Sequence, residues 1–384
     1  MTSQSSKLTS VAQSLPWGQT PWSIDFHSQA ISLPEHVDFA VVGGGFSGLS
    51  AAAELRRLDP RQTVAVFEAE TIGAGSSGHT GGLALAETAA GDLPGLGDVL
   101  AGFRNILKNL NVTADLSLPG VWELDRATAN ENSPIRWNDS GQLAVAQEVP
   151  GGTMNPGKLV SGLAKAASER GALVFEGAGV DQIDYGETLL LRVRRAQTHT
   201  RVHARRVLIA TNAESLELSG LAGRAEPKFT LALATEPLEA AKLEELGLSA
   251  GKPFYTVDLP YLWGRLVNES QIIFGSGLVS VENWRGLAAI NVHSGPAFSR
   301  LADLKNRVAR LHPVLAGIRF SHEWGGPILI GEEWRPVFHH HPRSDRALVL
   351  GAYSGHGVAL STYLGSWAAE VLLGRRKLPN WNSR

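Results

Sequence analysis

The hydrophobic pattern contains two stretches in which a continuous apolar run ends in glycines and is followed by a helical run. In the first, Asp38–Val42 predicts a buried strand, and the glycines after it lead into an Ala-rich helix that begins near Leu49. In the second, Ala347–Gly351 predicts a strand, and a Gly-His-Gly turn leads into a helix that begins at Gly357. These stretches predict two strand–turn–helix units near the two ends of the chain.

The segment between these units contains further regular elements. A cap Asn155, a Pro in the next position and helically spaced leucines predict a helix that ends at Gly171. Strands are predicted at Val64–Glu68, Ala172–Phe175, Thr188–Val193 and Thr200–Asn212. From about residue 229 to 324 the pattern becomes short strands separated by turns, with helices at Pro237–Leu246 and Pro296–Leu311. The fold class predicted from this order is α/β, with a second, β-rich part.

The first glycine turn has the spacing Gly43-x-Gly45-x-x-Gly48. Because the chain has 42 glycines, a chance match is expected roughly once in two such chains. Its context is more specific, since a second apolar strand follows and places Glu68 20 residues beyond Gly48. The turn would bring backbone N–H groups to a pyrophosphate, and Glu68 would accept from a ribose hydroxyl. The alternative is an ordinary βαβ unit with a tight turn.

A glycine-rich loop, Ala69–Leu85, follows Glu68. A backbone with few side chains can lie flat against a planar ligand, and Ser76, Ser77 and Thr80 supply donors for phosphate or ribityl oxygens. A mobile surface loop is the alternative interpretation.

Length and composition set limits on the class of protein. A chain of 384 residues exceeds the usual size of a single core, so two domains or one elaborated domain are expected. The net charge of −2 does not indicate a nucleic-acid partner, and the absence of cysteine excludes disulfides and thiolate chemistry. No apolar run is long enough for a membrane span, so we expect no membrane insertion and a cytoplasmic protein. Residues 1–37 are expected to form an arm held by Trp17 and Trp22, or a partly disordered leader.

Several segments, among them the strand that ends at Asn212 and the stretch Tyr261–Gly275, carry a resemblance to a known group of enzymes. The Gly43–Gly48 turn, Glu68-Ala-Glu70, the loop Gly73–Gly82 and the Ser354-Gly-His-Gly-Val358 turn are similar to the FAD-binding half of the D-amino-acid oxidase superfamily. That group includes glycine oxidase, sarcosine oxidase and γ-glutamylputrescine oxidase. His79 stands where the family loop often has an arginine.

The resemblance implies FAD as the cofactor. The residues expected to bind it are Gly43, Gly45, Phe46, Ser47, Gly48, Glu68, Ala69, Gly75, Ser76, Ser77, His79, Thr80, Gly81, Gly82, Ala210, Thr211, Gly355, His356, Gly357 and Val358. The helix that starts at Gly357 would direct its positive end at the flavin, which carries negative charge near N1 when reduced. We expect His356 to be held by packing while the N–H groups of its neighbours face the flavin.

The resemblance also divides the chain into domains. It implies a Rossmann-like FAD-binding domain made of residues 38–112, 150–228 and 325–384. An interleaved, β-rich α+β substrate domain would comprise residues 113–149 and 229–324.

The catalytic residues expected from the resemblance are Arg265, Tyr261 and His79. Arg265 aligns with a family position that often binds a substrate carboxylate, and Tyr255, Tyr261 and Trp263 are candidates for aromatic walls around a neutral amine. Three roles remain open for His79: a loop residue used through its backbone, a polar group facing the flavin, or a covalent tether to it.

The resulting hypothesis is an FAD-dependent enzyme that oxidises the C–N bond of a small amine or amino acid to an imine, with oxygen as acceptor and peroxide as product. One alternative is a dehydrogenase that uses a quinone or an electron-transfer protein. A second alternative is a flavin-binding module without turnover, which only the altered segment Glu332–Pro336 favours. A third is a nicotinamide dehydrogenase. No metal is expected at His339–His341, because adjacent residues of an extended segment point to opposite sides.

Overall fold

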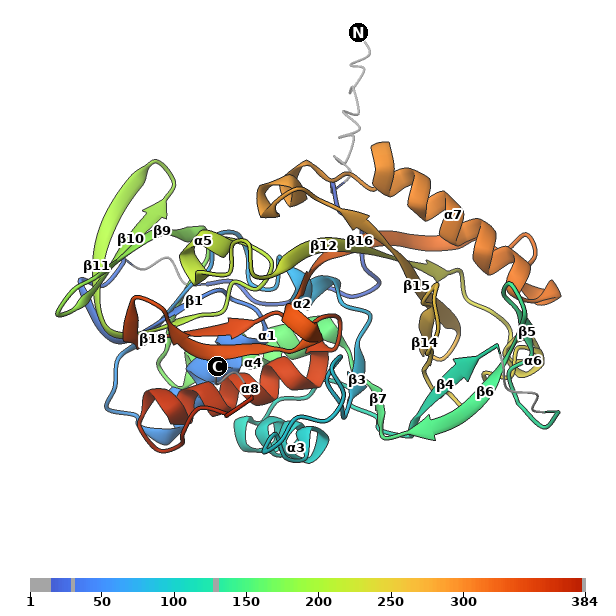
Figure 1. The fold of residues 1–384 in the computed structure, drawn as a ribbon, viewed down its shortest axis with the longest axis horizontal. Coiled ribbons are helices and arrows are strands. Elements are labelled where there is room, and N and C mark those ends of the chain that lie inside the picture. The colour runs from blue at the N-terminus through green and yellow to red at the C-terminus, as the bar shows by residue number, and fades with distance from the viewer. Residues whose placement is uncertain (1–14, 29–31, 127–130, 382–384) are drawn as a thin grey trace, which may run out of the picture.

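Two large sheets form the framework of the molecule. The computed structural model describes residues 15–28, 32–126 and 131–381. In Figure 1 the first sheet and the helices beneath it fill one half of the molecule, and the second sheet with its covering helix α7 fills the other. Strands of the two sheets alternate along the chain, so the chain crosses between the two halves several times.

The first sheet has a parallel centre, as the apolar runs of the sequence predict. Its strand order is β17-β18-β11-β1-β2-β8, and a β9–β10 hairpin extends β11. The pairs β11–β1, β1–β2, β2–β8 and β11–β18 are all parallel. The strands are β1 (His36–Val42), β2 (Val64–Phe67), β8 (Leu173–Phe175), β9 (Ala178–Tyr185), β10 (Leu189–Arg195), β11 (Thr198–Ile209), β17 (Val337–His341) and β18 (Ser344–Gly351).

Helices cover one face of this sheet. They are α1 (Phe46–Leu58), α4 (Pro156–Glu169) and α8 (Gly357–Leu372), and α3 (Val99–Leu110) packs on α8. Helix α1 lies between α4 and α8, and it approaches α8 so closely that a Cβ on Gly365 would lie 2.4 Å from the Ser47 carbonyl oxygen. Two buried hydrogen bonds add to this contact: Ser47 Oγ to the Tyr353 hydroxyl at 2.5 Å, and Ser50 Oγ to the Thr362 carbonyl at 2.8 Å. The two helices are therefore fixed relative to each other.

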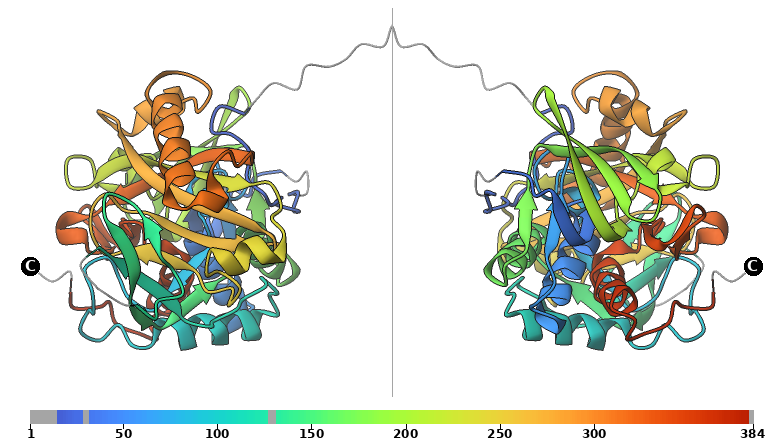
Figure 2. Two further views of the ribbon diagram at one scale, coloured as in Figure 1. Left: turned by 90° about the vertical axis from the view of Figure 1, so that its right-hand side faces the viewer. Right: turned by 90° about the vertical axis from the view of Figure 1, so that its left-hand side faces the viewer.

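The second sheet is almost entirely antiparallel. Its order is β16-β12-β15-β14-β13-β4-β6-β5, with β13–β4 as its parallel pair. Its strands are β4 (Val121–Asp125), β5 (Trp137–Asn138), β6 (Gln142–Val149), β12 (Glu226–Thr235), β13 (Phe254–Thr256), β14 (Trp263–Val267), β15 (Gln271–Ser280) and β16 (Phe320–Ile330). Helix α7 (Gly295–Leu311) packs on β12 and β15, and Figure 2 shows it in front of the sheet in the left-hand view.

Smaller elements complete the described chain. They are α2 (Ser76–His79), α5 (Leu216–Ser219), α6 (Ala240–Glu245), the pair β3 (Leu83–Leu85) and β7 (Gly151–Thr153), and three 3-10 turns at Trp284–Ala289, Pro313–Leu315 and Glu332–Trp334. The helix expected at Pro237–Leu246 is shorter than predicted, since it begins at Ala240. Helix α3, which the sequence analysis missed, buries Val99, Leu100, Phe103, Ile106, Leu107 and Leu110.

The predicted fold class is confirmed: a parallel α/β unit combined with a β-rich α+β unit. The two domain boundaries placed at 228/229 and 324/325 need adjustment, because β12 begins at Glu226 and β16 continues to Ile330 in the second sheet. The residues at both boundaries pair through their backbones within β12 and β16, so they belong to the second sheet. The division into an FAD-binding and a substrate domain remains a prediction.

The arm expected at residues 1–37 contacts the body in the part that is described. The Trp17 indole nitrogen donates to the Leu287 carbonyl at 3.2 Å, and the Trp22 indole nitrogen donates to the Gly78 carbonyl at 2.8 Å. Trp22 also packs edge-on against Trp324 of β16, with 5.6 Å between ring centroids. Residues 1–14 and 29–31 of this predicted arm lie outside the described residues.

Candidate active site

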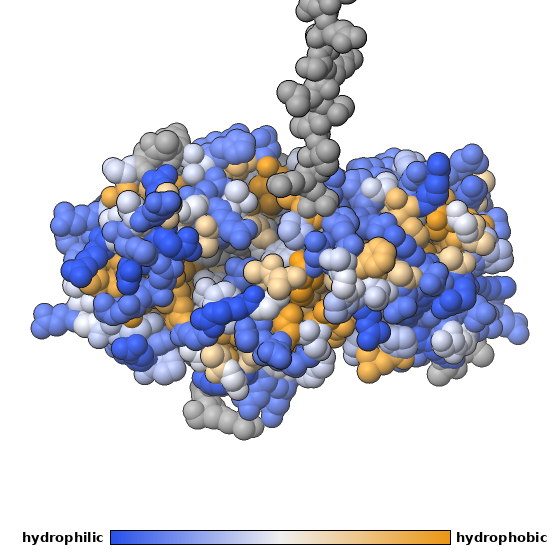
Figure 3. Space-filling model, turned by 90° about the horizontal axis from the view of Figure 1, so that it is seen from above, coloured by the Kyte–Doolittle hydropathy of each residue, from blue (hydrophilic) through white to orange (hydrophobic). Residues whose placement is uncertain are grey.

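A cavity of about 930 Å³ lies where the two sheets meet. Its lining comes from the β1–α1 turn, the loop after β2, the β18–α8 turn and the strands β12, β13 and β16. Seen from above, apolar residues reach the surface along the middle of the molecule, where its two halves meet, while hydrophilic residues cover most of both ends (Figure 3). The cavity joins the segments singled out in the sequence to the β-rich half.

The β1–α1 turn is built for close backbone approach. Gly43 has a φ of 108°, and a Cβ on it would lie 2.6 Å from the Ala210 carbonyl oxygen. A Cβ on Gly48 would lie 2.0 Å from the Gly43 carbonyl oxygen, so this glycine serves the packing of α1 on the turn. Gly43, Gly45, Phe46 and Ser47 line the cavity, whereas Gly48 does not.

The N-terminus of α1 opens into the cavity without a side-chain cap of its own. Its N-cap is Gly45, which has no side chain to cap the helix. The hydroxyl of Ser77 accepts from the Phe46 N–H at 2.9 Å. The positive end of this helix favours an anion.

Glu68 lies at the end of β2, beside this turn. Its carboxylate accepts from the Gly44 N–H at 2.7 Å and from the Glu70 N–H at 2.9 Å. Burial raises the pKa of Glu68, and the two N–H groups oppose that change. A third acid, Glu214, lines the same end of the cavity; burial and the charges of Glu68 and Glu70 raise its pKa to about 7.

The loop Gly73–Gly82 forms the next wall. Ser76 Oγ donates to the Pro327 carbonyl at 2.6 Å and accepts from the Asn212 side-chain amide at 3.0 Å. The loop is thereby tied to both sheets. Gly75, Ser76, Ser77, His79, Thr80 and Gly81 line the cavity, together with Ala69, Ala210 and Thr211. Gly82 does not, because its Cα faces the Met154 carbonyl and the Arg265 guanidinium.

His79 ends α2 and lines the cavity. Its Nδ1 lies 2.9 Å from the Gly75 carbonyl oxygen; since a carbonyl only accepts, Nδ1 carries the hydrogen. The ring packs edge-on against Trp17 at 5.4 Å between centroids. Burial lowers the pKa of His79, so the imidazole is neutral at pH 7.

The β18–α8 turn lies in the same wall. Gly355, His356, Gly357 and Val358 all line the cavity, and α8 has His356 as its N-cap without a side-chain bond. Gly355 has a φ of 91° and open space where a Cβ would stand. Burial lowers the pKa of His356. A second helix N-terminus therefore faces the cavity, and its N-cap side chain makes no capping hydrogen bond.

The residues present fit an extended, anionic and polar cofactor. Within the described residues, three buried polar atoms of the cavity wall have no hydrogen-bond partner: Thr211 Oγ1, His356 Nδ1 and Ser361 Oγ. Such groups cost free energy unless something pairs with them. Two helix N-termini, a carboxylate at the end of β2 and these unpaired groups would suit the pyrophosphate, ribose and flavin of FAD.

The other half of the cavity has apolar and acidic walls. Leu231, Leu262, Trp263 and Trp324 line it, as do Tyr255, Glu87 and Glu123. Tyr261 also lines it, with 49% of its surface exposed. Arg265 is 5% exposed and lies outside the lining, with its Nε donating to the Gly81 carbonyl at 2.5 Å.

Comparison with known proteins identifies the family. The pattern of the DAO family, described as FAD dependent oxidoreductase, matches residues 38–146 and 98–371. The chain belongs to this family of FAD-dependent oxidoreductases. The family, the FAD cofactor and the enzyme class predicted from the sequence are therefore confirmed.

Individual relatives cover most of the chain. The γ-glutamylputrescine oxidoreductase of Escherichia coli (strain K12) is 28% identical over 386 residues, which are 88% of this chain and 84% of the relative. The probable oxidoreductase OrdL of Haemophilus influenzae is 25% identical, with coverage of 91% and 86%. Among solved structures, glycine oxidase from Geobacillus kaustophilus has a TM-score of 0.68 at 20% identity, covering 90% of this chain and 96% of its own. L-proline dehydrogenase from P. horikoshii has a TM-score of 0.70 at 18% identity, with coverage of 91% and 97%.

Arg265 is placed differently from the expectation for this family. We expected it to bind a substrate carboxylate, but Gly81 and Gly82 cover its side chain. It follows Trp263 by two positions on β14, so both side chains lie on one face of the strand. The cavity wall ends at Trp263, and the glycine backbone then separates Arg265 from the cavity. Burial lowers the pKa of Arg265 to about 10, and one of its terminal nitrogens has no partner in the described part of the chain.

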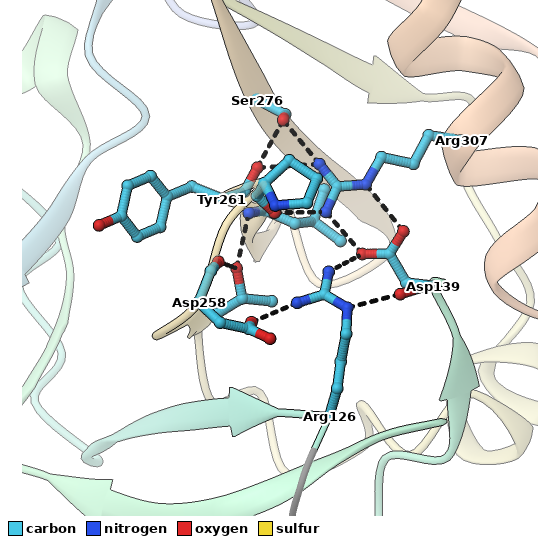
Figure 4. A network of polar contacts seen from close by, with 9 residues as sticks. Arg126, Asp139, Asp258, Tyr261, Ser276 and Arg307 are labelled. Carbon is cyan, nitrogen blue, oxygen red and sulfur yellow. Dashed lines mark hydrogen bonds and ion pairs between the residues drawn. The ribbon is translucent and has the colours of Figure 1, made fainter. Parts of the chain in front are cut away.

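Tyr261 is held by an ionic network that the sequence did not reveal (Figure 4). Arg307 of α7 donates to the Tyr261 carbonyl at 2.9 Å and bonds the Asp139 carboxylate at 2.5 Å. Arg126 bonds the same carboxylate at 2.6 Å and also contacts Asp258. The Tyr261 ring points away from these charges in Figure 4. The network fixes the backbone of the loop between β13 and β14 and leaves its aromatic side chain at the cavity.

Glu87, Glu123, Glu214 and Ser361 are cavity residues that the sequence analysis did not predict. Only Glu123 carried a signal, as an acid between apolar residues of the strand Val121–Asp125. The other three depend on tertiary contacts.

His339–His341 lie on β17, away from the cavity lining. The His341 ring stacks on Tyr185 at 4.6 Å, and His339 Nδ1 donates to the His340 carbonyl at 2.7 Å. Across residues 15–28, 32–126 and 131–381, no group of three or more metal-ligating side chains was found. In the same ranges, every helix is too short or too polar to cross a membrane.

Proposed function

We propose that this enzyme oxidises the C–N bond of a small amine or amino acid and passes the electrons to oxygen, with hydrogen peroxide as product. The observation that carries the proposal is a cavity that joins the two helix N-termini of the FAD-binding motifs to an aromatic and acidic pocket of the second sheet. The relatives support the substrate class, since one is named for γ-glutamylputrescine and another for glycine.

Bound FAD supplies the redox step, in which hydride leaves the C–H bond next to the amine nitrogen and an imine remains. Water then hydrolyses the imine, so that RCH₂NH₂, O₂ and H₂O give RCHO, NH₃ and H₂O₂. The protein needs no strong acid or base for this chemistry. Leu231, Trp263 and Trp324 exclude water from the amine and favour its neutral, reactive form.

The backbone around the cavity positions the reactants. The uncapped start of α8 would stabilise the negative charge that develops on the flavin. The Asp139–Arg307 network would hold the Tyr261 loop over the substrate. His79 and His356, both neutral at pH 7 because burial lowers the pKa of each, would serve as hydrogen-bonding groups.

The test is turnover of an amine and amino-acid panel by the purified flavoprotein under air, with peroxide and aldehyde or keto acid measured together. Equal amounts of peroxide and carbonyl product are expected. Turnover with artificial dyes but without oxygen consumption would contradict the oxidase and favour the dehydrogenase alternative. Failure of every substrate with every acceptor would contradict enzymatic oxidation of amines altogether.

A further inference from the structure

The most unusual group in the cavity is a tyrosine hydroxyl between two carboxylates. The Tyr255 hydroxyl donates to Glu123 Oε1 and also lies 3.1 Å from Glu87 Oε1. Tyr255 and Glu123 are register partners on the parallel strands β13 and β4, so their side chains leave the same face of the sheet. Glu87 arrives from the loop after β3. Three segments distant in sequence thus bring two acids to one wall of the cavity.

The hydrogens in this cluster do not suffice for its contacts. A tyrosine has one hydroxyl hydrogen, and an ionised carboxylate has none. The hydroxyl can donate to only one of the two acids. No hydrogen then lies between the hydroxyl oxygen and the facing carboxylate oxygen of the other acid. Gln147 donates its amide to the second oxygen of Glu123 at 2.5 Å, but it adds no charge. Two carboxylates around one hydroxyl repel each other unless a proton or a cation joins them.

The surroundings supply no such cation. Among the described residues that line the cavity, Arg194 is the only lysine or arginine, and it pairs with Asp181 at the far end. The nearby cations are engaged elsewhere: Lys252 with Glu148 at 2.5 Å, and Arg126 with Asp139. Arg265 lies behind the Gly81 backbone. Within the described residues, the lining beside these two acids therefore lacks the positive group that an amino-acid carboxylate requires.

A buried hydroxyl elsewhere in the wall of the same cavity also lacks a partner within the described part of the chain. Ser361 of α8 lines it with 4% of its surface exposed, and its hydroxyl has no partner among the described residues. His356 at the start of α8 lines the same cavity as Glu87 and Glu123. The acid pair and the turn expected to face the flavin therefore border one space.

We infer that Glu87 and Glu123 bind a second cationic group of the substrate, so that the enzyme prefers diamines to monoamines and to amino acids. This inference rests on the proposed function. One amine would lie neutral among the aromatic walls and react, while the distal ammonium would bridge the two carboxylates beside Tyr255. The ammonium group would then donate its hydrogens to carboxylate oxygens, which carry no hydrogen of their own.

Three four-carbon amines that differ only at the far end test the inference. They are 1,4-diaminobutane, butylamine and 4-aminobutanoate, which carry a cation, a methyl group and an anion. Binding to the FAD-loaded enzyme is measured without oxygen by calorimetry, and flavin reduction is followed separately by absorbance. We expect 1,4-diaminobutane to bind at least ~10-fold more tightly than butylamine, and 4-aminobutanoate to bind most weakly.

The variants Glu87→Gln and Glu123→Gln keep the shape of the side chain and remove its charge. Each is expected to weaken 1,4-diaminobutane binding about 10-fold or more, to leave butylamine nearly unchanged and to improve binding of 4-aminobutanoate. Glu245→Gln, at an exposed position of α6 and outside the cavity, is the control that should behave as the parent. The flavin spectrum reports whether each variant is folded, and the two acids test the inference independently.

The outcomes separate this inference from the proposed function. Equal binding of all three amines, or no charge-dependent change in either variant, would overturn the inference even if every amine reduced the flavin. Binding with the expected preference but without flavin reduction would support the acid pair and contradict the proposed function.

Discussion

The guanidinium of Arg265 donates from Nε to the carbonyl of Gly81 at 2.5 Å, beneath the loop that lines the candidate FAD site. It also lies over the Trp22 ring at 5.9 Å. This geometry assigns Arg265 to the support of the loop, rather than to contact with substrate.

The first prediction concerns this support. Arg265→Met is expected to lower the free energy of unfolding by about 1.5–3 kcal/mol, since it leaves the buried Gly81 carbonyl without its charged donor. It should also weaken FAD binding, and it should alter KM similarly for amines with and without a carboxylate. Thermal unfolding, FAD titration and KM values check this. Arg192→Met, at an exposed position of β10, is the control. A rise in KM confined to carboxylate substrates would instead restore the role expected from the sequence.

The second prediction tests the contact between α1 and α8. Gly365→Ala places a Cβ 2.4 Å from the Ser47 carbonyl oxygen, so one helix must move. We expect a loss of about 1–3 kcal/mol of stability and weaker FAD binding, because the N-termini of both helices border the cavity. Urea unfolding and FAD titration measure the two effects. Gly186→Ala, whose Cβ would meet no atom closer than 3.5 Å, should have little effect.

The third prediction concerns pH. Burial and the nearby acids Glu68 and Glu70 raise the pKa of Glu214 to about 7 from a usual value of 4.5. Between these values the folded protein holds a proton that the unfolded chain has lost, so the free energy of unfolding falls as the pH rises from about 4.5 to about 7. The stabilisation is complete below this window and absent above it. Glu214→Gln should flatten this part of the profile of the FAD-free protein, as measured by urea unfolding. An unchanged slope in the variant would show that other groups cause it.

The fourth prediction concerns the Tyr261 loop. Arg307→Met removes the bonds to the Tyr261 carbonyl and to Asp139. Because the loop borders the substrate half of the cavity, KM for the amine should rise about 10-fold while kcat changes less. Arg300→Met, at an exposed position of the same helix, should leave both constants unchanged. A fall in kcat with constant KM would show that the loop acts on the chemical step.

The fifth prediction settles the three roles left open for His79. Its Nδ1 hydrogen is committed to the Gly75 carbonyl, and its ring rests on Trp17. We expect FAD to be held without a covalent bond, so acid precipitation should leave the yellow colour in the supernatant. His79→Ala should weaken FAD binding and still release free flavin. Colour retained by the pellet of the parent, and lost from that of His79→Ala, would establish a tether.

The cofactor half of the site could be predicted from the sequence because its motifs are local. Gly43 and Gly355 mark backbone conformations with positive φ, and a strand followed by a helix fixes what their turns face. The substrate half could not be predicted in this way. Glu123 and Tyr255 meet only because β4 and β13 pair in one particular register, and Glu87 reaches them from the loop after β3. For Arg265 the alignment supplies the strand position but not the glycine backbone, which lies between its side chain and the cavity.

Helix α3 shows a different kind of omission. Val99, Phe103, Ile106 and Leu110 have the helical spacing of an amphipathic segment, and Asp98 caps it by accepting from the Ala101 N–H at 2.8 Å. That signal was present in the sequence. By contrast, the network of Arg126, Asp139 and Arg307 combines residues up to 181 positions apart, and no local sequence pattern predicts it.

The most direct test of the central claim is to mix the FAD-loaded enzyme with 1,4-diaminobutane without oxygen and to follow the visible flavin absorbance. The account predicts that the absorbance bleaches at a rate that saturates with amine, and that it returns when oxygen is admitted, with one peroxide formed per flavin reduced. A flavin that stays oxidised with this amine and with every other amine or amino acid tried would contradict the account.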